Sequence, residues 1–134
     1  MASNMSSKQE VVTAKAPQMD QSKFPFSQAI SYGGMIYCSG NIGINPETKA
    51  MVPGSITDRT IQALTNLSHI LEAGGSSLKN VVKVNVFITT MDDFDAMNKG
   101  YLQFFEKPLP ARTCVAVKQL PMNTDVEIEC VAHL

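Results

Sequence analysis

Residues 55–75 carry an apolar stripe with helical spacing between two clear end signals, and this stripe limits the folds that the chain can adopt. Ser55 and Asp58 form a Ser-x-x-Asp start that resembles a capping box, and Gly74-Gly75 supplies a left-handed stop. Between these signals the apolar positions are Ile61, Leu64, Leu67, Ile70 and Leu71. A helix with a single apolar face has to bury that face against another layer. We therefore expect this helix to lie on a β-sheet.

The strands of that sheet are predicted on both sides of this helix in the sequence. Residues 26–32 and 35–39 are β-prone runs that flank Gly33-Gly34, a pattern typical of a hairpin. A short strand is also predicted within residues 11–15. After the helix, residues 81–89 alternate between two faces. One face of this strand is predicted to carry Val82, Val84, Val86 and Ile88, and the other Lys83, Asn85, Phe87 and Thr89.

A second helix is predicted after this strand. Thr90 and Asp93 provide a start of the same kind, and Pro108 and Pro110 stop the helix from continuing. Its buried stripe is predicted to consist of Phe94, Met97, Tyr101 and Phe104 or Phe105.

Two further strands, residues 111–118 and 125–132, complete the element order ββαβαββ. This order predicts an α+β fold in which two helices pack on one face of a mixed sheet. The other face then has no cover, although its alternate residues, such as Phe87 and Val131, are partly apolar. We therefore expect a partner subunit to cover it.

The composition favours a single intracellular domain. The chain has 134 residues, and we expect one domain at residues 11–134 after a flexible lead-in at residues 1–10. A net charge of −1 argues against nucleic-acid binding, and no apolar run is long enough to span a membrane. Cys38, Cys114 and Cys130 are too widely spaced for a disulfide framework or a zinc site. Free thiols predict a cytoplasmic location, with the mitochondrial matrix as the alternative.

Charged residues near the C-terminus suggest a site for a small carboxylate. Arg112 and Cys114 share one face of their predicted strand, and Glu127 and Glu129 share one face of the last strand. If the two strands pair as a hairpin, the arginine and the glutamates project from the same face. Arginine suits bidentate binding of a carboxylate, and a nearby glutamate can orient or deprotonate water. The alternative is a salt bridge on a solvated strand face.

Several segments taken together resemble the Rid (reactive intermediate deaminase, or YjgF) family. The most specific is Pro-Ala-Arg-Thr-Cys-Val-Ala-Val-Lys-Gln-Leu-Pro at residues 110–121, followed by Val-Glu-Ile-Glu at residues 126–129. Other matching segments follow the same order along the chain, at residues 26–30, 38–42, 82–87 and 93–101. The resemblance covers nearly the whole chain from about Val11 onward.

This resemblance implies a chorismate-mutase-like α+β fold and a homotrimeric barrel with three sites between subunits. It implies that Arg112 holds the substrate carboxylate and that Glu127 positions the attacking water. The residues implied to line the site are Ser39, Gly40, Asn41, Asn98 and Cys114, with Phe26 at the position of a pocket-closing aromatic residue. No metal or organic cofactor is implied.

The implied activity is hydrolysis of 2-imino acids, such as 2-iminobutanoate and 2-iminopropanoate, to 2-keto acids and ammonia. Enzymes that use pyridoxal phosphate (PLP) release such imines, and their removal protects other PLP enzymes from damage. The reaction also proceeds slowly in water, so orientation by Arg112 and a positioned water suffice for the acceleration that is needed.

Two departures from the family pattern leave other functions open. The usual Gly-Pro-Tyr-Ser-Gln reads Phe-Pro-Phe-Ser-Gln here, so Phe26 lacks the tyrosine hydroxyl, and Asn41 replaces a glutamine. Both changes are compatible with a non-catalytic trimer that binds keto acids or acts as a chaperone. A ribonuclease or translation inhibitor is the third hypothesis, and the near-neutral charge argues against it.

Overall fold

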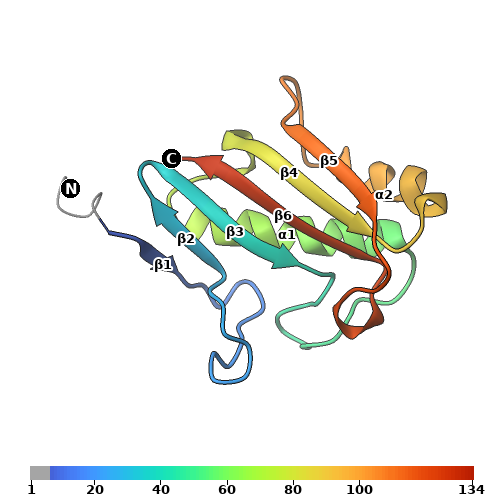
Figure 1. The fold of residues 1–134 in the computed structure, drawn as a ribbon, viewed down its shortest axis with the longest axis horizontal. Coiled ribbons are helices and arrows are strands. Elements are labelled where there is room, and N and C mark those ends of the chain that lie inside the picture. Colours follow the sequence, from blue (N-terminus) through green and yellow to red (C-terminus); the bar gives the residue numbers. More distant parts are fainter. Residues whose placement is uncertain (1–6) are drawn as a thin grey trace.

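The computed structural model describes residues 7–134, which form a mixed sheet and two α-helices (Figure 1). The strands are β1 (Gln9–Val11), β2 (Ala29–Tyr32), β3 (Met35–Asn41), β4 (Val81–Ile88), β5 (Ala111–Ala116) and β6 (Val126–His133). The helices are α1 (Ile56–Ala73) and α2 (Phe94–Tyr101), with single 3₁₀ turns at Leu78–Asn80, Met91–Asp93 and Pro121–Asn123. Of the predicted lead-in, residues 1–6 lie outside the described part, and Gln9 and Glu10 belong to β1.

The six strands lie in the order β1-β2-β3-β6-β4-β5. Among the strands of residues 7–134, only β4 and β5 run parallel, so the chain has to cross over between them, and α2 lies in that crossover. The predicted pairing of the last two strands as a hairpin is wrong, because β4 lies between β5 and β6. The hairpin of β2 and β3 is confirmed, and both residues of its turn, Gly33 and Gly34, have positive φ.

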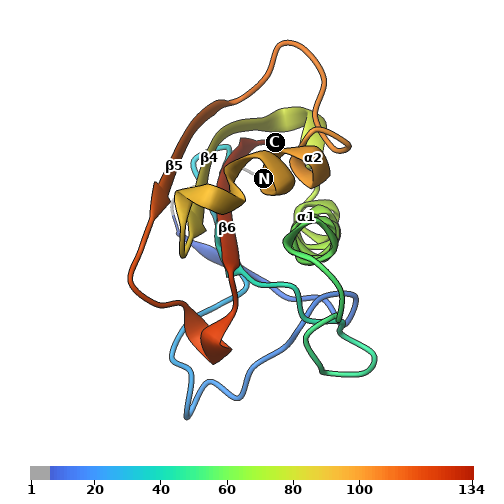
Figure 2. The same cartoon turned by 90° about the vertical axis from the view of Figure 1, so that its right-hand side faces the viewer.

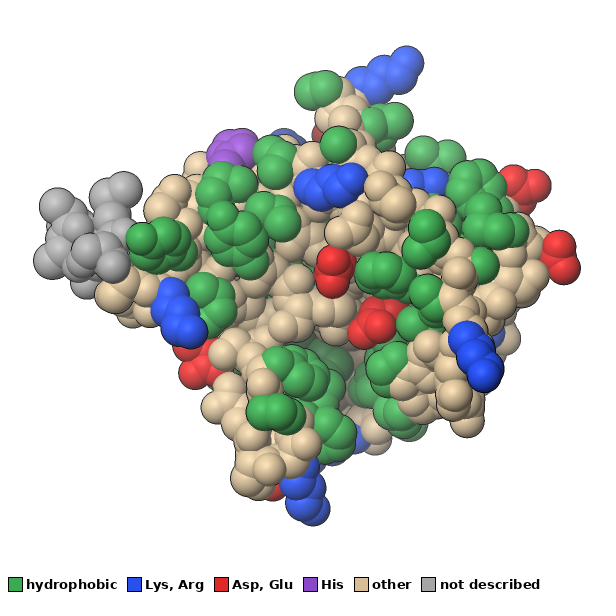
Figure 3. Space-filling view, viewed as in Figure 1, with side chains coloured by type: hydrophobic (Ala, Val, Ile, Leu, Met, Phe, Trp, Pro, Cys, Tyr) green, Lys and Arg blue, Asp and Glu red, His purple; other side chains and the backbone are tan. Residues whose placement is uncertain are grey.

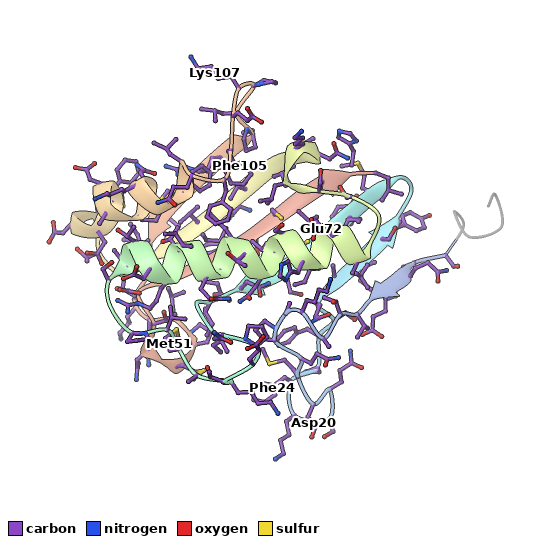
Figure 4. The ribbon with its side chains drawn as sticks, turned by 180° about the vertical axis from the view of Figure 1, so that it is seen from behind. Asp20, Phe24, Met51, Glu72, Phe105 and Lys107 are labelled. Carbon is purple, nitrogen blue, oxygen red and sulfur yellow. The ribbon has the colours of Figure 1, made fainter. Side chains whose placement is uncertain are left out.

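Both helices cover the same face of the sheet, as predicted (Figure 2). The capping box of α1 is present, since Ser55 accepts from the Asp58 amide and Asp58 accepts from the Ser55 amide. Gly75, with φ of 86°, follows the end of the helix. The apolar stripe of α1 packs on the inward side chains of the sheet, while Glu72 points outward (Figure 4). The core between helices and sheet includes Ile36, Leu64, Leu67, Leu71, Val84, Val86, Ile88, Val126 and Ile128.

Two details differ from the expected pattern. The register between β4 and β6 shifts between Val81 and Lys83, so Val81 is buried and Val82 is 43% exposed. In addition, α2 ends at Tyr101, earlier than expected. Phe104 and Phe105 pack against the core from the turns that follow it (Figure 4).

Residues 7–134 leave the other face of the sheet uncovered (Figure 3). Tyr37 is 49% exposed on it and Val115 is 42% exposed, beside the half-buried Phe87 and Val131. Apolar side chains lie beside acidic ones near the middle of this open face (Figure 3). Among residues 7–134, no helix has the length and apolarity needed to cross a bilayer.

We expect Leu67→Ala to lower the free energy of unfolding by about 2–5 kcal/mol, because Leu67 is fully buried between α1 and the sheet. Leu102→Ala is the matched control, since Leu102 is 60% exposed, and its effect should stay within about 0.5 kcal/mol. Urea denaturation followed by circular dichroism measures both. Equal losses in the two variants would contradict the core described here.

Candidate active site

Arg112 lies on the helix-covered side of β5 and is held by one face of α2. Its Nη1 donates a hydrogen bond of 2.7 Å to Oδ1 of Asn98. The guanidinium carbon lies 4.6 Å from the ring centroid of Tyr101 and 5.6 Å from that of Phe94. These three residues of α2 are spaced by four and three positions, so they share a face of the helix.

The guanidinium keeps donors for another partner. Within the described chain, its hydrogen bonds all start from Nη1, with Asn98 and with the sulfur of Met97 as acceptors. Nε and Nη2 are the donors that remain for a planar carboxylate. The structure thus brings Arg112 and Asn98 together, two of the predicted site residues.

Cys114 belongs to the same group, because it shares the face of β5 with Arg112. Burial raises the pKa of its thiol, and the charge of Arg112 opposes this only in part. Cys114 is therefore a neutral thiol at pH 7, which suits a lining residue better than a nucleophile.

The other predicted site residues line a cavity of about 650 Å³ at the opposite edge of β6. They are Phe26, Ser39, Gly40, Asn41 and Glu127. The Ser39 hydroxyl donates to the Ser27 carbonyl at 2.6 Å, and the Asn41 amide donates to the Ser39 carbonyl at 3.1 Å. These bonds fix the end of β3, where its pairing with β6 is interrupted between Cys38 and Asn41.

Glu127 belongs to β6, and its carboxyl group lines this cavity. Burial raises the pKa of its carboxyl, and the neighbouring charge of Glu129 raises it further. Glu129 is held by Asn85, whose Nδ2 donates to it at 2.9 Å. Glu127 also lies directly over Gly40, where a Cβ atom would come within 2.5 Å of Oε2. The carboxylate therefore has its position only because residue 40 has no side chain.

The two groups lie on opposite faces of the sheet in one chain. Arg112 is paired with the inward-facing Val84, whereas Glu127 is paired with Phe87, which faces the open side. The expectation that Arg112 and Glu127 project from one face is therefore wrong within a single subunit. Among its described lining residues, the cavity has two carboxylates, Glu10 and Glu127, and no lysine or arginine. Within one chain, the cation of Arg112 and the carboxylate of Glu127 are therefore in separate places.

The partners that position Arg112 are not apparent from the sequence. The sequence predicts Tyr101 and Phe94 only as core residues of α2, yet both also stack on Arg112. Their spacing from Asn98 is the signal that could have found them. Among the described residues, no group of three metal-binding side chains is placed to hold an ion.

Comparison with known proteins identifies the family. A family model described as endoribonuclease L-PSP matches residues 13–134. The chain belongs to the endoribonuclease L-PSP family. A 2-iminobutanoate/2-iminopropanoate deaminase of Dermatophagoides farinae is 45% identical over 127 residues, which cover 95% of this chain and 97% of that protein. Protein mmf1, mitochondrial, of Schizosaccharomyces pombe is 47% identical over a match that covers 81% of this chain and 67% of that protein.

Solved members of this family share the fold. The crystal structure of a Thermotoga maritima protein matches with a TM-score of 0.89 and 48% identity. The match covers 94% of this chain and 97% of the Thermotoga chain. RidA from an Antarctic Psychrobacter has a TM-score of 0.87 and 36% identity, over 94% of this chain and 99% of its own. The resemblance to the Rid family that the sequence indicates is therefore confirmed, and the α+β fold with it.

We expect Glu129→Gln to lower the pKa of Glu127. The substitution removes the like charge that raises this pKa but keeps an acceptor for Asn85, while the larger effect of burial remains. Carbon NMR of the labelled carboxyl groups measures the titration. Glu72→Gln, on the outward side of α1, is the control and should leave the pKa of Glu127 unchanged. An unchanged midpoint in Glu129→Gln would show that the two carboxylates are not coupled.

Proposed function

We propose that this protein is a deaminase that hydrolyses 2-imino acids such as 2-iminobutanoate and 2-iminopropanoate. The products are 2-keto acids and ammonia. Removal of the imines protects PLP enzymes from these reactive intermediates. The observation that carries the proposal is the carboxyl of Glu127, which lies half-buried in a cavity and has a raised pKa. The naming of family members as 2-iminobutanoate/2-iminopropanoate deaminases supports it.

In the proposed mechanism Glu127 acts as the base. It accepts a proton from a water molecule as the water oxygen bonds to the carbon of the protonated imine, which gives a neutral carbinolamine. Glu127 then gives this proton to the nitrogen and accepts the proton of the carbinolamine hydroxyl as the carbonyl forms, the C–N bond breaks and ammonia leaves. A raised pKa makes the carboxyl a better base than an ordinary glutamate, and the same group then serves as the acid.

The substrate carboxylate is bound by Arg112 of a second subunit in this proposal. The charged residues that line the cavity of one chain are carboxylates, which repel an anion. Arg112, on the other face of the sheet, has N–H donors that are free to bind one. A neighbour that packs on the open face brings the missing charge and also covers Tyr37 and Val115. We propose the homotrimer of the Rid family as this assembly, with Asn98 and Cys114 beside Arg112 in each of three sites.

Two other functions remain as alternatives. A trimer that binds keto acids or acts as a chaperone is favoured by Phe26, which leaves the cavity without a tyrosine hydroxyl at that position. A ribonuclease or translation inhibitor is favoured by the family description. The net charge of −1 and the two carboxylates of the cavity oppose phosphate binding. We propose the cytoplasm as the location, in keeping with three free cysteines, and the mitochondrial matrix as the alternative, given the relative named mitochondrial.

We expect Arg112→Ala to abolish the acceleration of imine hydrolysis, because the substrate carboxylate then has no cation to bind. The assay generates the imine with an amino-acid oxidase and measures how the protein reduces trapping by semicarbazide. Size-exclusion chromatography checks that the assembly is intact. Arg112→Lys keeps the charge but not the bidentate geometry and should retain only part of the activity. Full activity in Arg112→Ala would contradict the proposed role.

Mixed assemblies test whether the site spans two subunits. Arg112→Ala and Glu127→Gln should each be inactive alone. Co-refolding them in equal amounts should restore about one quarter of the sites, because an intact site takes Arg112 from one kind of subunit and Glu127 from the other. No recovery in a mixed assembly of the correct size would show that both residues act within one chain.

We expect Gly40→Ala to reduce kcat by at least about tenfold with little loss of stability. The new Cβ would displace the Glu127 carboxylate, and misplacement of a base by about 1 Å can cost a hundredfold. The backbone at residue 40 is not in the left-handed region, so alanine itself is tolerated there. Thermal unfolding and kcat measured together separate a displaced base from a damaged fold, and an unchanged kcat would argue against Glu127 as that base.

A further inference from the structure

Glu127 lies near the end of β6, where the pairing of this strand with both of its neighbours becomes incomplete. The pairing with β4 ends at Val126. The pairing with β3 is regular up to Cys38 and resumes at Asn41, and β3 has one extra residue in between. Gly40, over which the Glu127 carboxylate lies, belongs to this irregular stretch. Because strand ends open more easily than strand centres, contacts outside the sheet determine how firmly this carboxylate is held.

An ion pair between Arg59 and Asp125 makes such a contact. Asp125 directly precedes β6, and Arg59 belongs to the first half of α1. The guanidinium binds the carboxylate with two hydrogen bonds, from Nε to Oδ1 at 2.7 Å and from Nη2 to Oδ2 at 2.8 Å. The two side chains are only 18% and 26% exposed, so water screens this pair less than an ordinary surface pair. The start of β6 is thereby joined to a helix.

The same arginine also contacts the segments that flank the site on the other side. Its Nη1 donates to the carbonyls of Val52 and Gly54 at 3.4 and 3.2 Å. A Cβ atom on Gly43 would come within 2.8 Å of the Arg59 Cβ, so the segment that follows β3 packs directly on this side chain. Arg59 therefore joins the continuation of β3, the loop before α1 and the start of β6, which meet at one end of the sheet (Figure 1).

The continuation of β3 has a second attachment to α1 that does not depend on Arg59. Asn66, about two helical turns farther along, is fully buried. Its amide donates to the carbonyls of Ile42 and Ile44 at 3.4 and 2.9 Å. Loss of the Arg59 guanidinium is thus expected to loosen the start of β6 more than the end of β3.

We infer that Arg59 and Asp125 are positioning residues for Glu127, because their ion pair holds the start of β6 against α1 and so keeps the carboxylate over Gly40. The inference rests on the proposed function, since it concerns the base of that reaction. The described residues that line the cavity do not include Arg59 or Asp125. Both therefore act on the reaction through the backbone of β6 and not by touching the substrate.

The first test is a kinetic comparison of two substitutions of Arg59. Arg59→Met keeps much of the apolar stem and removes the guanidinium, so we expect kcat for imine hydrolysis to fall about tenfold. KM should change less than about twofold, because Arg112, the proposed ligand of the substrate carboxylate, is untouched. Arg59→Lys keeps the charge but not the paired hydrogen bonds with Asp125, so its kcat should lie between these two values.

Lys79→Met is the matched control for loss of a cation. Lys79 is exposed on the 3₁₀ turn before β4, and β4 begins opposite Ala132, at the other end of β6 from Glu127. All rates are measured well below the thermal unfolding midpoint of each variant, with the size of the assembly checked by chromatography. An unchanged kcat in Arg59→Met, or an equal fall in Lys79→Met, would overturn the inference.

The pKa of Glu127 separates a positioning role from a simple change of charge. Loss of a cation by itself raises the pKa of a carboxyl group. A loosened strand end instead lets water reach Glu127 and lowers its pKa, because burial is the largest cause of its raised value. Carbon NMR should therefore show a lower pKa in Arg59→Met and no change in Lys79→Met. A raised or unchanged pKa in Arg59→Met would contradict the positioning role.

A double-substitution cycle tests whether the two residues act as a unit. Asp125→Asn should lower kcat to about the same extent as Arg59→Met. The variant with both substitutions should lose no more than the worse of the two single variants, because either change already breaks the same ion pair. Losses that multiply in the double variant would show that the residues act independently and would overturn the inference.

The NMR measurement also keeps failure of the inference distinct from failure of the proposed function. If the native protein hydrolyses no imine, the deaminase proposal is wrong, and a lowered pKa of Glu127 in Arg59→Met still supports the positioning role. If the native protein hydrolyses imines but Arg59→Met matches it in both kcat and the pKa of Glu127, the positioning role is wrong and the deaminase proposal stands.

Discussion

The alternation of side chains along β6 is the constraint on which the rest of the structure depends. This strand pairs with β3 on one edge and β4 on the other, so it cannot rotate without breaking both ladders. Val126, Ile128 and Ala132 are fully buried beneath the helices. The intervening residues then have to face the open side, and among them are Glu127 and Glu129. Core packing thus fixes the face on which the carboxylates of Glu127 and Glu129 lie.

The sequence predicts those elements whose signals are local. Neighbours in the chain determine the start, apolar stripe and end of α1 and the Gly33-Gly34 turn. They also determine the burial of Val84, Val86 and Ile88. The pairing of β5 with β4 instead of β6 cannot be predicted from such local signals. It depends on a crossover in which the whole of α2 separates the two paired strands in the sequence. The exposure of Val82 likewise depends on a local shift in register against β6.

The candidate site shows the same division. Residue types and family motifs indicate Arg112 and Glu127, but not that they lie on opposite faces of one sheet. The stacking of Tyr101 on Arg112 follows from how α2 crosses the sheet, and the cavity follows from where the loop of residues 17–28 is held. Contacts between segments distant in sequence determine both, and no short pattern encodes them.

Each chain has a complete core of its own between the helices and the sheet, yet only part of the charges that the proposed chemistry needs. On the proposed arrangement, folding and the gain of activity are therefore separate events with different concentration dependence. A newly made or highly diluted subunit can be fully folded and still have no catalytic activity. Activity would then rise more steeply than in proportion to the amount of protein in the cell, so that abundance itself becomes a control on imine removal.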